Sequence, residues 1–349
     1  MRFRFNIMTY SEVLKNARKY IKANCNCCPV CNGVACKNRM PGPGSKGSGT
    51  GAARNYNAWQ RWHINMNTMH DQFTPDPRLD FLGQSFALPL FAGPVGSVNQ
   101  HYGDKYSDSE YNRILVEACA KSGIAAFVGD SVHDSVIARS IEAIARVNGR
   151  AVPTIKPWHM DEALSRVARF KKARPFAMAM DIDAAGLPFL KDIAPPTCSK
   201  NVQDLHQIAK ESGVPFIIKG IMTANAASRA IKAEASAIIV SNHGGRVLDG
   251  CAPTAEVLPE IANAVGGRMP VIVDGGIRSG QDMFKALALG ADAVIIARPF
   301  VNAVFGGGAE GVSVYIEKLA AEFIDTMSMA GARTLADITP DMVRAADWS

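Results

Sequence analysis

The stretch Ile238-Ile-Val-Ser-Asn-His-Gly-Gly-Arg-Val-Leu-Asp249 decides how the rest of the chain is interpreted. It begins with apolar, β-branched residues and continues into a polar cluster with two adjacent glycines. This order is typical of a buried parallel strand that ends at a working surface. His243 can exchange a proton near neutral pH, and Arg246 can bind a carboxylate or phosphate through two parallel hydrogen bonds. Taken alone, the fragment is also compatible with a plain strand-to-loop junction carrying a surface His and Arg.

Similar apolar runs recur along the chain, and each is followed by polar or Gly/Pro residues and then by a helical pattern. Their starts lie 22 to 39 residues apart, which fits repeated strand–helix units. Eight such units predict an α/β fold, a (β/α)8 TIM barrel. A doubly wound open sheet is the alternative, but Phe91-Ala-Gly-Pro-Val-Gly-Ser97 lacks the Gly-x-Gly-x-x-Gly turn that such a sheet needs. The predicted strands are Leu88–Pro94, Ile124–Asp130, Ala151–Pro157, Phe176–Asp183, Pro215–Ile221, Ala237–His243, Pro270–Gly276 and Ala293–Pro299.

The chain divides by composition into an N-terminal helical, Cys-rich extension over residues 1–87 and a barrel over residues 88–349. Residues 9–24 have the apolar spacing of an amphipathic helix, and Tyr315–Met329 is the predicted closing helix, with Gly331 past its end. The 349 residues are 48% hydrophobic and 20% charged, as in an ordinary globular protein. No apolar run reaches membrane-spanning length and the start lacks a signal peptide, which predicts a cytoplasmic protein without a membrane partner.

The net charge of +6 is concentrated at the N-terminus. Residues 1–50 contain nine Lys or Arg and one acid, a balance of 9 − 1 = +8, so the other residues carry −2. Such a segment suits an acidic partner protein or a bound anion. No RNA-binding motif or zinc-finger helix accompanies it, so we expect no nucleic-acid partner.

Five of the eight cysteines fall within twelve residues: Cys25, Cys27, Cys28, Cys31 and Cys36. In a cytoplasmic chain such a cluster indicates a metal site rather than a disulfide framework. A zinc ribbon needs a second Cys pair downstream, and the three other cysteines are isolated, so an iron–sulfur cluster is favoured over zinc. Redox-active or merely unpaired thiols are the remaining alternative. Four ligands suffice, and the sequence leaves open which cysteine is spare.

Charged residues gather at the ends of the predicted strands, where the active site of such a barrel lies. These ends include Gly93-Pro94, Gly129-Asp130, Lys156, Asp181 and Asp183, Lys219, and Ser241 with His243 and Arg246. The last two strands end in Asp274-Gly-Gly-Ile-Arg278 and Ala297-Arg-Pro299, at the position where barrels bind phosphate. A phosphorylated cofactor or substrate is therefore expected. Lys219, on the opposite side of the rim, would be well placed to stabilise a developing anion.

Together these motifs resemble the FMN-dependent α-hydroxy-acid oxidase/dehydrogenase family, which includes glycolate oxidase and lactate oxidase. The resemblance extends from about residue 88 to 340. It implies a homo-oligomer and FMN bound at the strand ends, with Gly129 and Thr154 on the same rim. It also implies that His243 is the base, that Asp181 orients it, and that Arg246 binds the substrate carboxylate. The implied FMN-binding residues are Gly93, Pro94, Gly129, Thr154, Lys219, Ser241, Asp274, Gly275, Gly276, Arg278, Ala297 and Arg298.

The chain departs from the family pattern where the substrate is anchored. The family's third-strand tyrosine is replaced in Thr154-Ile-Lys156, and its second carboxylate-binding arginine has no counterpart in Ala184-Ala-Gly-Leu-Pro-Phe-Leu190. Tyr20 is the match for the family's N-terminal tyrosine. Lys156 is predicted to replace a lost substrate anchor as a point charge.

These observations predict an FMN-dependent oxidoreductase that converts a lactate- or glycolate-like 2-hydroxy acid to the 2-oxo acid. Electrons then pass to oxygen or to a redox partner protein. Two alternatives remain open: an FMN-binding barrel isomerase similar to the type 2 isopentenyl diphosphate isomerases, and a non-catalytic flavin/metal electron carrier.

Overall fold

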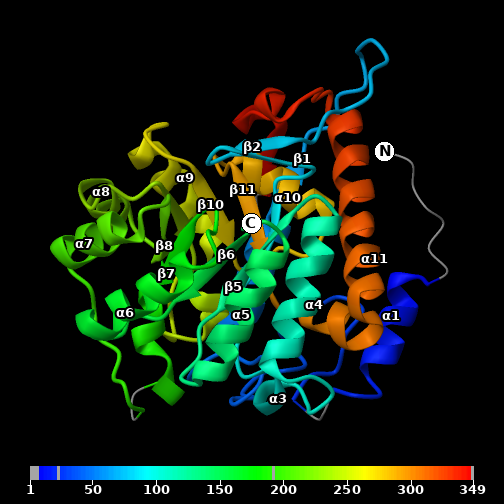
Figure 1. Ribbon diagram of the computed structural model, residues 1–349. Coiled ribbons are helices and arrows are strands. Elements are labelled where there is room, and N and C mark those ends of the chain that lie inside the picture. Colours follow the sequence, from blue (N-terminus) through cyan, green and yellow to red (C-terminus); the bar gives the residue numbers. More distant parts are fainter. Residues whose placement is uncertain (1–7, 22–23, 191–192, 347–349) are drawn as a thin grey trace.

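A closed barrel of eight parallel strands forms the centre of the molecule (Figure 1). The computed structural model describes residues 8–21, 24–190 and 193–346. All eight predicted strands are confirmed, although each is shorter than its apolar run because the ends turn into loops. In barrel order they are β4 (Leu90–Ala92), β5 (Ala125–Gly129), β6 (Ala151–Ile155), β7 (Met178–Asp181), β8 (Phe216–Ile221), β9 (Ala237–Val240), β10 (Val271–Asp274) and β11 (Ala293–Ile296).

An outer layer of helices covers the barrel. In chain order they are α3 (Val98–His101), α4 (Asp108–Lys121), α5 (Asp134–Arg146), α6 (Met160–Lys171), α7 (Val202–Ser212), α8 (Ala224–Lys232), α9 (Thr254–Val265), α10 (Gly280–Ala288) and α11 (Arg298–Ala330). Non-helical backbone at Gly308 interrupts α11, and Gly331 in the left-handed region ends it, so the predicted closing helix is confirmed. None of the described helices is both long and apolar enough to cross a membrane.

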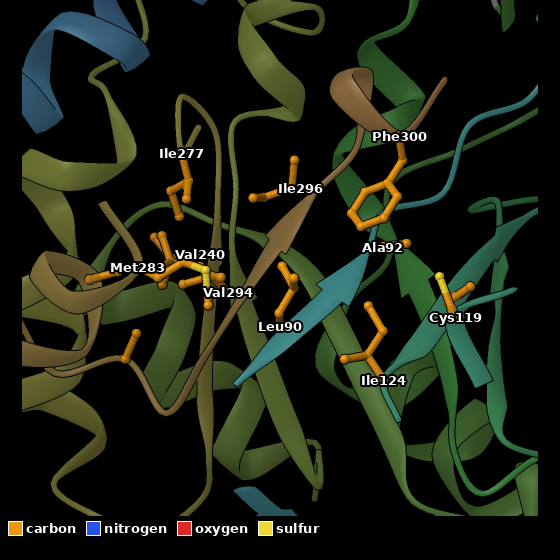
Figure 2. Close-up of a cluster of buried hydrophobic side chains, with 14 of the residues drawn as sticks. Leu90, Ala92, Cys119, Ile124, Val240, Ile277, Met283, Val294, Ile296 and Phe300 are labelled. Atoms are coloured by element: carbon orange, nitrogen blue, oxygen red, sulfur yellow. The ribbon is translucent and has the colours of Figure 1, made fainter. Parts of the chain in front are cut away.

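Successive side chains along a barrel strand point alternately toward the surrounding helices and toward the barrel interior, which gives two apolar layers. Leu90 and Ala92 of β4 face the helices, in one cluster with Val294, Ile296 and Phe300 (Figure 2). The intervening Phe91 faces the barrel interior. This is the period of two expected of a parallel strand buried on both faces.

The N-terminal end of the barrel is closed by the hairpin of β2 (Leu79–Phe81) and β3 (Gln84–Phe86). Phe81 and Phe86 pack against Phe91 at ring-centroid distances of 5.4 and 5.1 Å. Because this end is filled by aromatic side chains, only the opposite mouth of the barrel is available for a ligand.

The N-terminal segment packs onto the barrel at several places. Helix α1 (Tyr10–Ala17) lies against α11 (Figure 1), and β1 (Trp62–Ile64) pairs antiparallel with β12 (Val343–Ala345). A capping box between Thr9 and Glu12 starts α1, but the helix ends at Ala17 and not at residue 24 as predicted. Residues 22–23 of the predicted helix, and Arg2, Arg4 and Lys22 of the basic segment, lie outside the described residues.

Candidate active site

The open mouth of the barrel contains a cavity of about 400 Å³ at the C-terminal ends of the strands. This volume is in the range of small-molecule and cofactor sites. Its wall includes most of the predicted rim residues. Those that line it are Pro94, Gly129, Asp130, Lys156, Lys219, His243, Arg246, Asp274, Gly275, Gly276, Arg278, Ala297 and Arg298.

His243 opens a short 3-10 turn (His243–Gly245) directly after β9 and has a left-handed φ of 56°. Its backbone N–H donates to Ser241 Oγ (3.1 Å), which fixes the turn, and its ring Nδ1 lies 3.1 Å from Asp183 Oδ1. Burial and the nearby Lys219 lower the pKa of His243 below 6.5, against the opposing effect of Asp183. The imidazole is therefore neutral at pH 7 and able to accept a proton.

Lys219 on β8 lies between two carboxylates. Its Nζ is 3.9 Å from Asp183 Oδ1 and 3.7 Å from Asp274 Oδ2. Burial alone would lower the pKa of Lys219, but the facing carboxylates raise it above its ordinary value. For the Asp183 carboxyl group, burial acts in the opposite direction and would raise the pKa. Lys219 and His243 outweigh burial and bring the pKa of Asp183 below its ordinary value. The site therefore holds a buried ammonium and an ionised Asp183 around a neutral imidazole.

Several buried polar atoms at or just behind the C-terminal ends of the strands have no hydrogen-bond partner in the described chain. They are Thr154 Oγ1, Asp181 Oδ1, Asp183 Oδ2, Lys219 Nζ and Asp274 Oδ1. Buried polar groups are normally satisfied, because leaving one unpaired costs about 1–3 kcal/mol. Their concentration at one mouth indicates a polar ligand with both donors and acceptors, which a flavin ring edge provides.

Asp181 lies beside His243 and is paired with a lysine. Its Oδ2 forms a 2.6 Å ion pair with Lys156 Nζ from the neighbouring strand, and its side chain is only 1% exposed. The hydrogen bond to His243 comes from Asp183, two residues farther along. Ligand atoms of Asp181, Asp183 and His243 nevertheless lie within 4.8 Å of one another, so the orienting role of Asp181 stays a prediction. Strand β7 ends at Asp181 and the following 3-10 turn (Ile182–Gly186) brings Asp183 toward the imidazole.

Two glycines after β10 form a close-packed loop supported by the N-terminal helix α2 (Gly51–Gln60). A Cβ on Gly276 would lie 2.3 Å from the backbone oxygen of Asn55, so only glycine fits there. Trp59 Nε1 donates to the Gly275 carbonyl (2.7 Å) from the same helix. Sequence reasoning anticipated the glycines but missed this support, since nothing local to α2 indicates which loop it contacts.

Two arginines complete the side of the cavity formed by β10 and β11. Arg278 Nε donates to the Cys31 carbonyl (2.7 Å), and Arg298 Nη1 donates to the Pro43 carbonyl (3.1 Å). Each guanidinium has five N–H donors, so both retain donors for a bound anion. With the two glycines, they make the donor set expected of a phosphate site.

Arg246 lies on the wall of the cavity and contacts the loop before α2. Its Nη1 donates to the carbonyls of Gly42 and Gly44, and its guanidinium lies 5.8 Å from the centre of the Phe189 ring. Burial lowers the pKa of Arg246 to about 10, so it remains a cation at neutral pH.

Other positions on the wall were missed or misplaced by sequence reasoning. Tyr102 and His101 line the cavity from the segment after β4, as does Phe189 from the short turn Pro188–Leu190. Tyr20, the expected tyrosine, is 47% exposed, and its ring lies under Lys105 Nζ at 3.8 Å. Tyr102 is a buried tyrosine that does reach the cavity, although no motif marks it. Of the expected FMN-binding residues, Gly93, Thr154 and Ser241 lie behind the wall and not on it.

Comparison with known proteins gives a consistent family. The sequence matches the family described as FMN-dependent dehydrogenase over residues 42–192 and 186–345. An L-lactate oxidase from Nostoc sp. is 46% identical over 302 residues, covering 74% of this chain and 80% of that protein. An L-lactate oxidase from Lactobacillus jensenii is 45% identical over 146 residues. That match covers 42% of this chain but only 36% of the relative.

Solved structures agree with the sequence matches. A mandelate oxidase variant with 2-hydroxy-phenylacetamide superimposes with a TM-score of 0.79 and 26% identity, covering 97% of this chain and 98% of that one. Mandelate oxidase with 3,3-difluoro-2-hydroxy-3-phenylpropionic acid gives a TM-score of 0.78 at 27% identity, covering 94% and 96% of the two chains.

Proposed function

Because this chain belongs to the FMN-dependent dehydrogenase family, we propose that it binds FMN and oxidises a lactate- or glycolate-like 2-hydroxy acid to the 2-oxo acid. The observation that carries the proposal is the pair of His243 and Asp183. This neutral imidazole, held by an ionised carboxylate, faces a cavity of about 400 Å³. A proton acceptor and a cofactor-sized space thus lie in one place.

The proposed FMN site uses the side of the mouth formed by β8, β10 and β11. Arg278, Arg298 and the Gly275–Gly276 loop would hold the phosphate, since backbone N–H groups and guanidinium donors both favour a dianion. Lys219, whose buried Nζ lacks a hydrogen-bond partner among the described residues, would donate to the polar edge of the ring. When bound, FMN supplies the two-electron acceptor that the oxidation requires.

The proposed proton chemistry belongs to His243. Its neutral ring takes the proton that the substrate's carbinol loses, and the imidazolium formed is stabilised by the ionised Asp183 at 3.1 Å. Lys219 opposes this protonation electrostatically and keeps His243 neutral before the reaction. The three groups together therefore set both the resting state and the protonated state of the base.

Arg246 is the proposed anchor for the substrate carboxylate, and Tyr102 lines the same cavity as a buried, neutral hydroxyl. Lys156 also lines it, but its ammonium is paired with Asp181. Its predicted role as a substrate anchor therefore has to compete with this ion pair. Because the family's third-strand tyrosine and second arginine are not matched in this chain, substrate preference has to be measured. Lactate and glycolate are the first substrates to compare, and bulkier 2-hydroxy acids come next.

The acceptor of the electrons is proposed to be oxygen or a protein partner, and the two differ in their products. Oxygen gives hydrogen peroxide in a ratio of one to the 2-oxo acid formed, whereas a protein acceptor gives none. The N-terminal basic residues are partly used inside the molecule: Lys46 Nζ donates to the Gly186 and Val247 carbonyls at 2.9 and 2.8 Å. Relatives named as oxidases make peroxide the first product to measure.

A direct test is to load the protein with FMN and supply a panel of (S)- and (R)-2-hydroxy acids in air. We expect formation of the matching 2-oxo acid from one enantiomeric series, with glycolate or lactate among the active members. Flavin-loaded protein that produces no 2-oxo acid from any member, with artificial electron acceptors also present, would contradict the proposal. The isomerase alternative is not favoured by the relatives, all of which are named as oxidases or dehydrogenases in the matches above.

A further inference from the structure

Four of the five clustered cysteines surround a small cavity on the N-terminal segment. Cys25, Cys28, Cys31 and Cys36 line it, together with Arg298 and Asn302 from the start of α11. Cys27 is not part of this wall. Its side chain is fully buried in the hydrophobic core, while its backbone N–H donates to Cys25 Sγ (3.5 Å).

The four lining cysteines have a spacing with chemical meaning. They follow the order C-x2-C-x2-C-x4-C, and its first three members match the start of the run that binds [4Fe–4S] clusters in bacterial ferredoxins. The intervening Cys27 has a left-handed φ of 44°, which turns the chain between Cys25 and Cys28. The loop backbone thus places Cys27 in the core, while Cys25 and Cys28 line the cavity.

The separation of the thiols distinguishes between metals. A tetrahedral zinc site with Zn–S bonds of about 2.3 Å places its sulfurs about 3.8 Å apart. Among the described residues, the only trio of His, Cys, Asp or Glu with ligand atoms within 4.8 Å of one another is Asp181, Asp183 and His243. The thiols are thus spread more widely than zinc requires. In a cubane cluster each thiolate binds a different iron at a separate corner, which demands wider spacing.

Positive charge and hydrogen bonds surround this loop. Arg18 donates to the carbonyls of Asn26 (3.1 Å) and Cys27 (3.0 Å), and Arg278 to that of Cys31 (2.7 Å). Arg298 itself lines the cavity. These guanidinium groups fix the loop and offset the negative charge that four thiolates would bring to a cluster.

We infer that Cys25, Cys28, Cys31 and Cys36 are the ligands of a [4Fe–4S] cluster and that Cys27 is the spare, structural cysteine. The cavity is about 20 Å³, so the four side chains would have to turn outward from its centre to admit the cluster. Tyr102 and Arg298 line this cavity and the barrel-mouth cavity alike. The cluster would therefore be a neighbour of the proposed phosphate site.

The test begins with the full chain expressed and purified without oxygen, or reconstituted with ferrous iron and sulfide. We expect about four irons and four acid-labile sulfides per chain, and an electron paramagnetic resonance signal after reduction with dithionite. Bound FMN is measured in the same sample, so the outcome is independent of the proposed oxidation. Wild-type protein without iron and sulfide after reconstitution, or with stoichiometric zinc and no sulfide, would overturn the inference.

Variants then assign the ligands. Cys28→Ser and Cys31→Ser should each lose most of the iron and sulfide while retaining FMN. Cys27→Ala and Cys198→Ser, the matched controls, should keep both. Retention of a full cluster by the Cys28→Ser/Cys31→Ser double variant would overturn the assignment. So would loss of the cluster from a Cys27→Ala protein that still binds FMN. If Cys27→Ala fails to fold, the double variant and the wild-type iron content still decide the question.

Discussion

The two sides of the barrel mouth are built by different means. On the side of β10 and β11, close-packed glycines and backbone contacts from α2 shape the surface, with Gly276 against the Asn55 backbone. On the side of β6 and β7, side-chain ion pairs shape it, with Lys156 bound to Asp181. The first side depends on short contiguous motifs, and the second on pairs of residues from different strands. We therefore expect substitutions on the two sides to affect cofactor retention and substrate turnover separately.

The largest effect is expected at the residue between the two sides, His243. His243→Ala removes the proton acceptor and should lower kcat for the best 2-hydroxy acid by about 100- to 10,000-fold. FMN content should stay unchanged, because the proposed phosphate donors lie on the other strands. Steady-state assays with the bound flavin quantified give both values. A His243→Ala enzyme with nearly normal kcat would remove His243 from its role as base.

Two neighbouring carboxylates offer a matched comparison on the side of β7. Asp183→Asn removes the charge that stabilises protonated His243, and should lower kcat by about 100-fold, within the range of general-base effects. Asp181→Asn leaves the bond at 3.1 Å intact and should have the smaller effect on kcat. Measuring kcat and KM for both variants tests the assignment. The reverse order of effects would return the orienting role to Asp181.

Arginine substitutions compare the two sides directly. Arg278→Lys removes guanidinium donors from the proposed phosphate site and should weaken FMN affinity about tenfold or more, since charged hydrogen bonds contribute about 1.5–3 kcal/mol. Arg246→Lys should instead raise KM for the hydroxy acid by a similar factor. Fluorescence titration with FMN and substrate saturation curves give the two constants. Equal loss of FMN affinity in the Arg278→Lys and Arg246→Lys variants would contradict the division of the barrel mouth into an FMN-binding side and a substrate-binding side.

The smallest expected effect is a shift in pH dependence. The base must be neutral to accept a proton, and burial and Lys219 lower its pKa below 6.5. The value of kcat/KM should therefore be constant near pH 7 and fall only as the pH drops below 6.5. Asp183 raises the pKa of His243, so Asp183→Asn should move this acidic limb to still lower pH. An acidic limb centred above pH 6.5 in the wild-type enzyme would contradict the proposed electrostatics.

The architecture was largely predictable because every barrel strand is a local signal. Each of the eight apolar runs ends in a polar or Gly/Pro residue and is followed by a helical pattern, and short-range patterning of this kind determines the fold class. The β2–β3 hairpin that closes the barrel was not anticipated. Its strands have three residues each, too few for a period of two to be recognised.

The site was predictable where it depends on motifs and not where it depends on long-range packing. Most of the expected residues after β9, β10 and β11 line the cavity, although Ser241 lies behind its wall. The hydrogen bond between Asp183 and His243 depends on a 3-10 turn after β7, whose geometry is set by its contacts with β8 and the loop at Val247. A Cβ on Gly220 would lie 2.8 Å from the Asp183 Cβ, and one on Gly186 would lie 3.0 Å from the Val247 carbonyl oxygen, which shows how closely these segments pack. Likewise, the sequence could not tell which of the five cysteines differs from the others. The folded loop shows that it is Cys27, because the other four line one cavity.

The most direct test of the central claim is an anaerobic titration of the FMN-loaded protein with a single 2-hydroxy acid. A poised imidazole beside a flavin predicts that the flavin's visible absorbance is lost on mixing and that one 2-oxo acid forms for each two electrons taken up. A flavin that dithionite reduces readily, but that lactate, glycolate and bulkier 2-hydroxy acids all leave oxidised, would contradict it.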